Sequence, residues 1–256
     1  MAENRDTTAA LGEADLLAQR WQRLPGRIFA FLISADILLV LAYAVAVALG
    51  LAARKGFNVV NLDLENNPAD WFSSAQYLVA AIPFLAMGLR FLPEKRPAAA
   101  LWRLWLTVGA GLMLLSLDEG ASLHERLGRV ARKVGVGISG HGGAAWIVVY
   151  LAIGLGLVLL LRADIVRAWR EWRPELLIFA FGFVVLILGG GVFETIGHVM
   201  KLQGTLHFVE VGVEEGLEMF GVSIMALASY RVLSRSAAGS RGLESPASAS
   251  GESTGS

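Results

Sequence analysis

Residues 176–193 read LLIFAFGFVVLILGGGVF, an uncharged apolar run that is long enough, as a helix, to cross most of a bilayer core. Five more apolar runs follow the same pattern in this chain of 256 residues, of which 55% are hydrophobic. A soluble core does not need several apolar runs of roughly 20 residues each. The sequence therefore predicts an all-α, polytopic integral membrane protein with a bundle of about six transmembrane helices.

The predicted spans divide the chain into three parts. The spans are 28–52, 71–92, 101–117, 144–161, 176–193 and 208–233. They form a membrane domain over 28–233, preceded by a cytoplasmic segment over 1–27 in which 13–27 has the pattern of an amphipathic helix. The Ser-, Gly- and Ala-rich residues 234–256 are predicted to be a disordered cytoplasmic tail. The third and fifth runs continue into polar, helix-compatible sequence over 118–133 and 194–202.

The distribution of basic residues predicts the orientation. The 22 Lys and Arg residues balance 22 acids, so net charge gives no argument for a nucleic-acid partner. Fifteen of the basic residues lie in the termini and the second and fourth connections, and seven lie in the other three connections. Because Lys and Arg are enriched on the cytoplasmic side, both termini are expected to be cytoplasmic.

All four histidines fall on the predicted outer side, and acids accompany them. The histidines are His124, His141, His198 and His207, and the acids are Asp118, Glu119, Glu125, Glu194, Glu210, Glu214, Glu215 and Glu218. We expect these residues to gather at one end of the bundle, where they form the most informative feature of the sequence.

Helical geometry indicates which of these side chains share a face, because successive residues are rotated by about 100°. On the last span, one wedge of roughly 80° holds His207, Glu210, Glu214 and Glu218. Glu215 points away from that wedge. On the fifth span Glu194 and His198 are an i, i+4 pair, and on the third Asp118 and Glu125 lie about 20° apart.

Acids inside the hydrocarbon region need a neutralising partner. Counting outward from Arg231 places Glu214, Glu215 and Glu218 within the membrane. Each charged side chain there costs roughly 2.5–3.5 kcal/mol. Protons would neutralise these acids, and a divalent cation would do so more completely and would explain the accompanying imidazoles.

The absence of cysteine restricts the ligands of such a cation to oxygen and nitrogen. This donor set favours iron, then zinc or manganese. The candidate metal ligands are Asp118, His124, Glu125, Glu194, His198, His207, Glu210, Glu214 and Glu218. They exceed one tetrahedral shell, so one or two metals are expected. Glu119 and Glu215 are the candidate catalytic acids or bases.

This set of residues is similar in its chemistry to the carboxylate-bridged di-metal centres of helical bundles, which combine Glu with Glu-x-x-His motifs. Two departures separate it from that pattern. Glu194 and His198 are one residue too far apart, and His207 precedes Glu210 where the motif has the reverse order. The similarity therefore implies a kind of site and not a family.

The leading hypothesis is an integral-membrane metalloenzyme that oxidises or hydrolyses a lipid-like or other hydrophobic small molecule among membrane lipids. Two alternatives stay open. Intramembrane acids also mark divalent-cation or proton transporters, and in a non-catalytic subunit they would form only a structural polar cluster. Same-helix ion pairs of Glu119 with Arg126 and of Glu125 with Arg129 are the structural alternative for those two acids.

Glycines and one isolated acid complete the predictions. Small residues let helix backbones approach each other, so the glycines at 189–191, 212 and 216 are expected to draw the fifth and sixth spans together. Asp36 lies far from the predicted site. We expect it to hydrogen-bond with Ser34 or with a neighbouring helix.

Overall fold

The computed structural model describes residues 3–51, 55–64, 67–91, 101–123, 126–127, 130, 133 and 145–241, without the side chains of 3–18, 55–56, 145–147, 198 and 239–241. These residues form helices and connections and contain no strand. In chain order the helices are α1 (Glu3–Ala48), η2 (Lys55–Val59), α2 (Pro68–Phe91), α3 (Trp102–Ala121), α5 (Ala145–Leu160), α6 (Arg162–Ile187), η5 (Leu188–Phe193), α7 (Glu194–Met200) and α8 (Thr205–Arg241).

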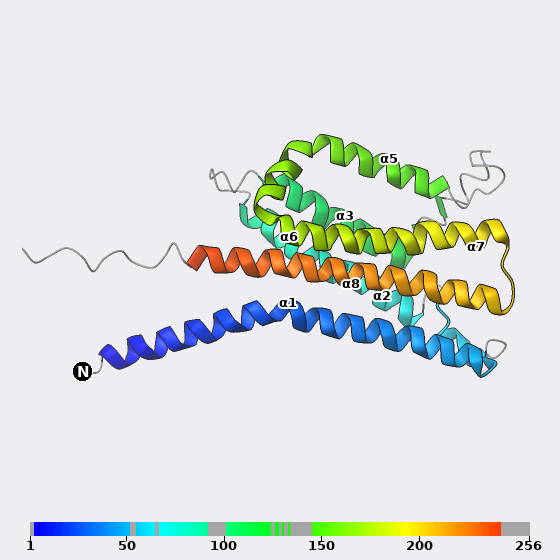
Figure 1. Cartoon of the computed structure of the whole chain (residues 1–256), viewed down its shortest axis with the longest axis horizontal. Coiled ribbons are helices and arrows are strands. Elements are labelled where there is room, and N and C mark those ends of the chain that lie inside the picture. The colour runs from blue at the N-terminus through cyan, green and yellow to red at the C-terminus, as the bar shows by residue number, and fades with distance from the viewer. Residues whose placement is uncertain are drawn as a thin grey trace, which may run out of the picture.

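The long helices run up and down in an antiparallel bundle, with the start of α1 and the end of α8 at the same end (Figure 1). The predicted all-helical fold is confirmed. All six apolar runs are helical, but α5 contributes only a shorter apolar helix over Val148–Leu160. Within the described part of the chain, five helices are long and apolar enough to cross a membrane: Gln19–Ala48, Pro68–Phe91, Trp102–Ala121, Arg162–Gly197 and Thr205–Ala238.

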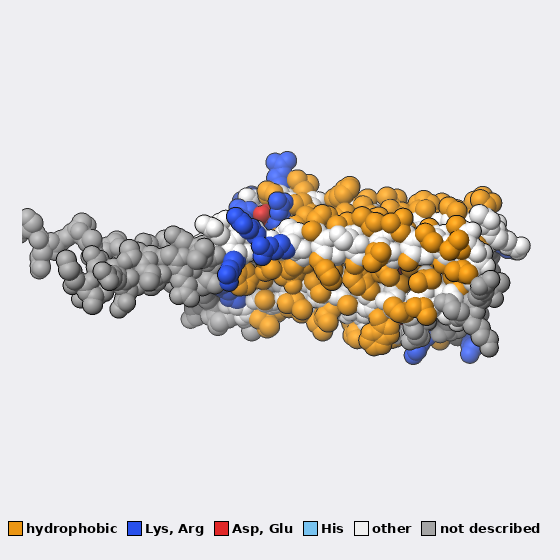
Figure 2. All heavy atoms as spheres, turned by 90° about the horizontal axis from the view of Figure 1, so that it is seen from below, with side chains coloured by type: hydrophobic (Ala, Val, Ile, Leu, Met, Phe, Trp, Pro, Cys, Tyr) orange, Lys and Arg blue, Asp and Glu red, His pale blue; other side chains and the backbone are white. Residues whose placement is uncertain are grey.

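Charge separates the two ends of the bundle. Figure 2 shows apolar side chains over its middle and most Lys and Arg side chains at the end where α8 finishes, which we call the basic end. There the Arg235 guanidinium lies 3.1 Å from Glu175 and over the Trp172 ring. Asp164 is buried between Arg103 and Arg167, at 3.5 and 3.6 Å.

Helices α2 and α3 pack as a close hairpin. Ser74 and Ser116 each donate a hydroxyl hydrogen bond to the other's backbone carbonyl, both at 2.7 Å. A Cβ on Gly88 or Gly109 would lie within 3 Å of a leucine side chain on the opposite helix, so both positions require glycine. This hairpin holds the end of α3 next to α2 at the end opposite to the basic end.

Helices α6 and α8 pack through glycines, although not through the pair that the sequence suggested. Gly182 and Gly221 let the two backbones meet. The Gly212 and Gly216 pair instead lies against Tyr43 and Val40 of α1. The expectation that this pair joins the fifth and sixth spans is therefore wrong, because helical periodicity identifies a small-residue face but not the helix that packs on it.

Several helix boundaries differ from those predicted. Helix α1 continues through Pro25, so the helix expected over 13–27 is joined to the first span. Helix α3 stops at Ala121 because Ser122 adopts a left-handed conformation. Helix α8 extends to Arg241, so residues 234–241 of the predicted tail are helical, and residues 242–256 lie outside the described part.

The segment between α6 and α7 is π-helical. Over Leu188–Phe193, which includes Gly189, Gly190 and Gly191, the turns widen, and the Glu194 backbone N–H bonds to the Gly189 carbonyl five residues earlier. A π-helical turn accommodates an extra residue within a helix and is frequent at functional sites. The predicted polar continuation of the fifth span follows it as α7.

Replacing Gly221 with alanine is expected to destabilise the protein by about 1–3 kcal/mol. The added Cβ would lie 2.6 Å from the Leu186 backbone nitrogen and 2.7 Å from the Gly182 carbonyl oxygen. The midpoint of thermal unfolding in detergent measures this effect. Gly111→Ala is the matched control, because its Cβ meets no atom within 4 Å. Equal midpoints for the two variants would contradict the packing described above.

Candidate functional site

Helix α8 presents one line of acids to η5 and α7. A Cβ at Gly197 would collide with the Glu210 carboxyl, and a Cβ at Gly190 would lie 2.5 Å from Glu218 Oε1. Gly189 lies against the Glu214 carbonyl and the Glu218 side chain. The glycines of η5 and α7 therefore provide the space that these carboxyl groups occupy.

A second line of acids lies on the other side of α8. Glu119 of α3 is the strongest electrostatic neighbour of Glu215, and Asp70 at the start of α2 is a further one. Glu215 also acts strongly on Glu218. Glu215 thus points away from the first line, as the helical geometry predicts, but it faces other acids instead of leaving the site.

The acids from α3, α7 and α8 form one electrostatic group. Glu214 lies within interaction range of the Glu210 carboxyl and within electrostatic range of Glu194. Neighbouring carboxyl groups favour sharing a proton or a cation, because nearby like charges disfavour double ionisation. We call this group the acidic cluster, and its members are Glu119, Glu194, Glu210, Glu214, Glu215 and Glu218.

The strongest electrostatic neighbours of the acids on α8 are themselves acids. This holds for Glu214, Glu215 and Glu218. At the basic end, by contrast, the buried acids Asp164 and Glu175 lie next to arginines. The acidic cluster therefore differs in kind from the ion pairs that anchor the other end of the bundle.

His207 lies at the rim of the cluster, between two acids. Its Nδ1 is 3.2 Å from Glu210 Oε2, and its Nε2 is 3.5 Å from Asp63 Oδ2. The connection that carries Asp63 is fixed by Asn67, which caps α2 by accepting hydrogen bonds from the backbone N–H groups of Ala69 and Asp70. His207 thus lies beside Glu210, with which it was predicted to share a face, and beside Asp63.

Two buried tyrosines border the cluster. The Tyr43 ring packs against Gly212, and its hydroxyl is buried without a hydrogen-bond partner in the described part of the chain. Tyr43 lies within electrostatic range of Asp63, Glu210 and Glu215. Tyr77 of α2 is similarly placed with respect to Glu218 and Glu119. Sequence analysis did not select these tyrosines, nor Asp63 and Asp70.

Of the remaining candidate ligands, the structure describes the side chain of Asp118 alone. Asp118 is buried and lies within interaction range of the Tyr150 hydroxyl on α5. His124 and Glu125 lie outside the described residues, as does the side chain of His198. Among the side chains that the structure describes, no three His, Asp or Glu groups are arranged to hold a metal ion.

Asp36 lies in a separate polar group at the centre of the bundle. Gln76 Nε2 donates to Asp36 Oδ1 at 2.6 Å and to Ser223 Oγ at 2.9 Å, and the Ser223 hydroxyl donates to Asp36 Oδ2 at 2.7 Å. We call these three residues the core triad. The predicted bonding of Asp36 to a neighbouring helix is confirmed, whereas Ser34 donates to the Ala30 carbonyl.

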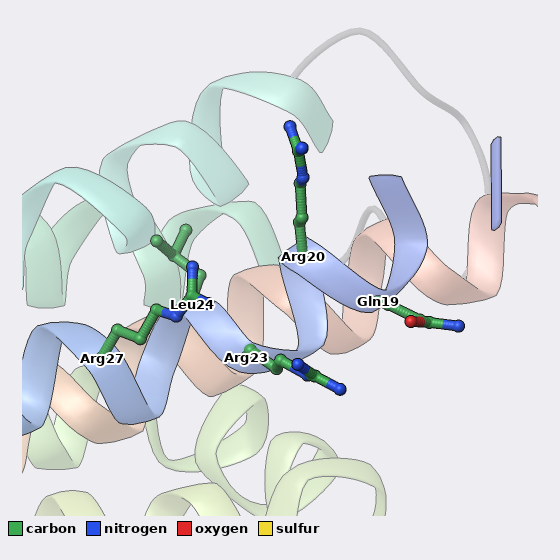
Figure 3. Close-up of a pocket in the computed structure, with 5 residues that line it drawn as sticks. All are labelled: Gln19, Arg20, Arg23, Leu24 and Arg27. Carbon is green, nitrogen blue, oxygen red and sulfur yellow. The ribbon is translucent and has the colours of Figure 1, made fainter. Parts of the chain in front are cut away.

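A hollow of about 490 Å³ lies at the basic end (Figure 3). Figure 3 shows that the Arg20, Arg23 and Arg27 side chains point in different directions from α1, with Leu24 among them and Gln19 at one end of the group. Because the guanidinium groups do not converge, the hollow does not form a compact anion site.

Residues 28–232 match the family described as Domain of unknown function (DUF8692). The chain belongs to this family. The matched region covers α2 to α7, the second part of α1 and most of α8, and thus both the acidic cluster and the core triad. No curated protein and no solved structure matches this DUF8692 chain.

The contrast between the two ends of this DUF8692 protein predicts opposite effects of removing a charge. In chelator-treated protein at neutral pH, Glu218→Gln is expected to leave the thermal unfolding midpoint unchanged or raise it, because one like charge leaves the cluster. Glu175→Gln, the matched control, is expected to destabilise by about 1–3 kcal/mol, because Arg235 loses its carboxylate. A larger loss for Glu218→Gln would contradict the described electrostatics.

Proposed function

We propose that this protein is an integral-membrane metalloenzyme whose acidic cluster binds one or two divalent metal ions. The observation that carries the proposal is the gathering of carboxylates from three helices, in which the strongest electrostatic neighbours of Glu214, Glu215 and Glu218 are other acids. A divalent cation neutralises two such charges at once. The oxygen and nitrogen donors favour iron, then zinc or manganese.

The ligands would come from the line of acids that faces α7 and η5. In this proposal Glu210, Glu214 and Glu218 join Glu194 and His207, while Asp118, His124, Glu125 and His198 remain candidate ligands. Metal binding would require side-chain rotation, because His207 now hydrogen-bonds to Glu210. The buried, unpartnered Tyr43 hydroxyl supports the proposal, since it supplies a polar group beside the acids that a ligand or bound water would satisfy.

The second line of acids would supply proton transfer. Glu119 and Glu215 lie on the side of α8 away from η5, next to the proposed ligands. A carboxylate in that position can act as a general base toward a metal-bound water or a substrate hydroxyl. We therefore keep Glu119 and Glu215 as the candidate catalytic residues.

The substrate would be lipid-like or another hydrophobic small molecule. Helix α5 exposes apolar side chains such as Leu151, Ile153 and Leu159, and its Tyr150 reaches Asp118. This arrangement supports access to the site from the surrounding lipid. By the enrichment of Lys and Arg on the cytoplasmic side, we place the basic end and both termini in the cytoplasm and the acidic cluster in the extracytoplasmic half.

Metal analysis of the detergent-purified protein tests the proposal. Without chelators, wild-type protein is expected to carry about one or two metal ions per chain, and Glu214→Gln and Glu218→Gln are expected to lose most of them. Glu171→Gln is the matched control, because this acid is exposed on α6 outside the cluster. Equal metal contents in all variants, or none in the wild type, would overturn the proposal.

A flux assay distinguishes an enzyme from a transporter. In proteoliposomes loaded with a metal-sensitive dye, the proposed enzyme is expected to leave divalent-cation uptake at the level of empty vesicles. Uptake by the wild type that Glu214→Gln abolishes and Glu171→Gln preserves would replace the enzymatic function with transport.

A further inference from the structure

The core triad carries an inference that is independent of the acidic cluster. We propose that Asp36, Gln76 and Ser223 form a proton-binding site, in which Asp36 takes up and releases one proton while the Gln76 side-chain amide turns over. The triad joins α1, α2 and α8, and each of its members is at most 1% exposed.

The observed arrangement fits the ionised form of Asp36. Each carboxylate oxygen accepts one hydrogen bond, at 2.6 Å from Gln76 Nε2 and at 2.7 Å from the Ser223 hydroxyl. The second N–H of Gln76 goes to Ser223 Oγ at 2.9 Å. All hydrogens of the triad are therefore used, and both carboxylate oxygens have a donor.

The protonated form of Asp36 fits the same atomic positions after one rotation of the Gln76 side-chain amide. Turning the Gln76 amide by about 180° exchanges Oε1 with Nε2, which differ little in size and position. Oε1 would then lie where Nε2 now lies and accept the new O–H of Asp36. The Ser223 hydroxyl would still donate to the other Asp36 oxygen or to Oε1. One proton enters, Asp36 and Ser223 keep their partners, and the Gln76 N–H groups move to the place that Oε1 now occupies.

One oxygen of the triad is unpartnered in this arrangement of the described residues, and a second unpartnered oxygen lies on the same face of α2. Gln76 Oε1 and Ser73 Oγ are buried and, among the described residues, have no hydrogen-bond partner. Ser73 and Gln76 are three residues apart on α2, hence on one face. An unpartnered buried acceptor is costly, so the ionised arrangement leaves a cost at Oε1, and turning the amide gives this oxygen the O–H of Asp36 as a partner.

The geometry favours a proton over a metal ion. The Gln76 amide nitrogen already lies between the carboxylate and the serine oxygen, so a metal ion would have to displace it, whereas a proton needs no added volume. The strongest described interactions of the Asp36 carboxyl are with Ser223 and Gln76. Titratable residues on the helices of the bundle include Tyr43 on α1, Tyr77 on α2, Asp118 on α3, Glu175 on α6, and Glu218 and Tyr230 on α8.

Infrared difference spectroscopy of the full chain in lipid tests this site. Between about pH 5 and about pH 9, the wild type is expected to show a protonated-carboxyl C=O band that disappears as the pH rises. Asp36→Asn should lose this component, and Ser34→Ala, the matched control on α1, should retain it. Ser223→Ala should move the midpoint upward by about one pH unit, because the ionised form loses a donor.

Each other outcome counts against the site. A titrating band that survives unchanged in Asp36→Asn would assign it to another carboxyl, and the absence of any titrating band in the wild type would show that Asp36 keeps one protonation state. If Asp36→Asn does not fold, Ser223→Ala and Gln76→Leu retain the carboxyl. Unchanged midpoints in both would overturn the proposal.

Discussion

Burial of carboxyl groups on an otherwise apolar helix is the constraint on which the arrangement of the bundle depends. Helix α8 contacts α1, α2, α6 and η5, so its acids lie on the helix that has the most neighbours in the bundle. Each neighbour meets them with small or polar residues. Glycines of η5 and α7 lie over Glu218 and Glu210, while Glu119 of α3 lies near Glu215. Aromatic residues pack on both sides of the polar regions: Phe84, Trp105 and Trp172 pack together nearer the basic end, and Tyr43, Phe57 and Phe208 pack near His207.

The two polar regions surround their carboxyl groups with different kinds of neighbour. In the core triad, Asp36 is surrounded by neutral donors, and the hydrogen bonds stabilise a charge without a counterion. In the acidic cluster, Glu214 and Glu215 have acids as neighbours, so the local structure supplies repulsion. Buried Met219 and Val222 lie between the two regions along α8. The regions therefore respond to their surroundings separately.

Much of this arrangement could be predicted from the sequence, because it depends on local periodicity. Apolar runs identified the helices, and the 100° rotation per residue placed Glu210, Glu214 and Glu218 on one face. Periodicity does not say which neighbour a face meets, so the partner of Gly212 was predicted wrongly. Asp63 and Tyr43 were missed for a related reason. Asp63 lies in a connection and Tyr43 lies within an apolar span, so only tertiary contacts show that they belong near the acids.

The π-helical turn at Leu188–Phe193 has a consequence for how this family can vary. One extra residue within a helix rotates everything that follows by about 100°, so Glu194 and Gly197 face α8 only because the turn is wide. Deletion of a single glycine would restore a regular helix and still leave an apolar span of full length. It would nonetheless carry Glu194 to a different side of the bundle. The number of residues in this glycine stretch therefore determines which side chains reach the site, even though it hardly changes the hydropathy of the span.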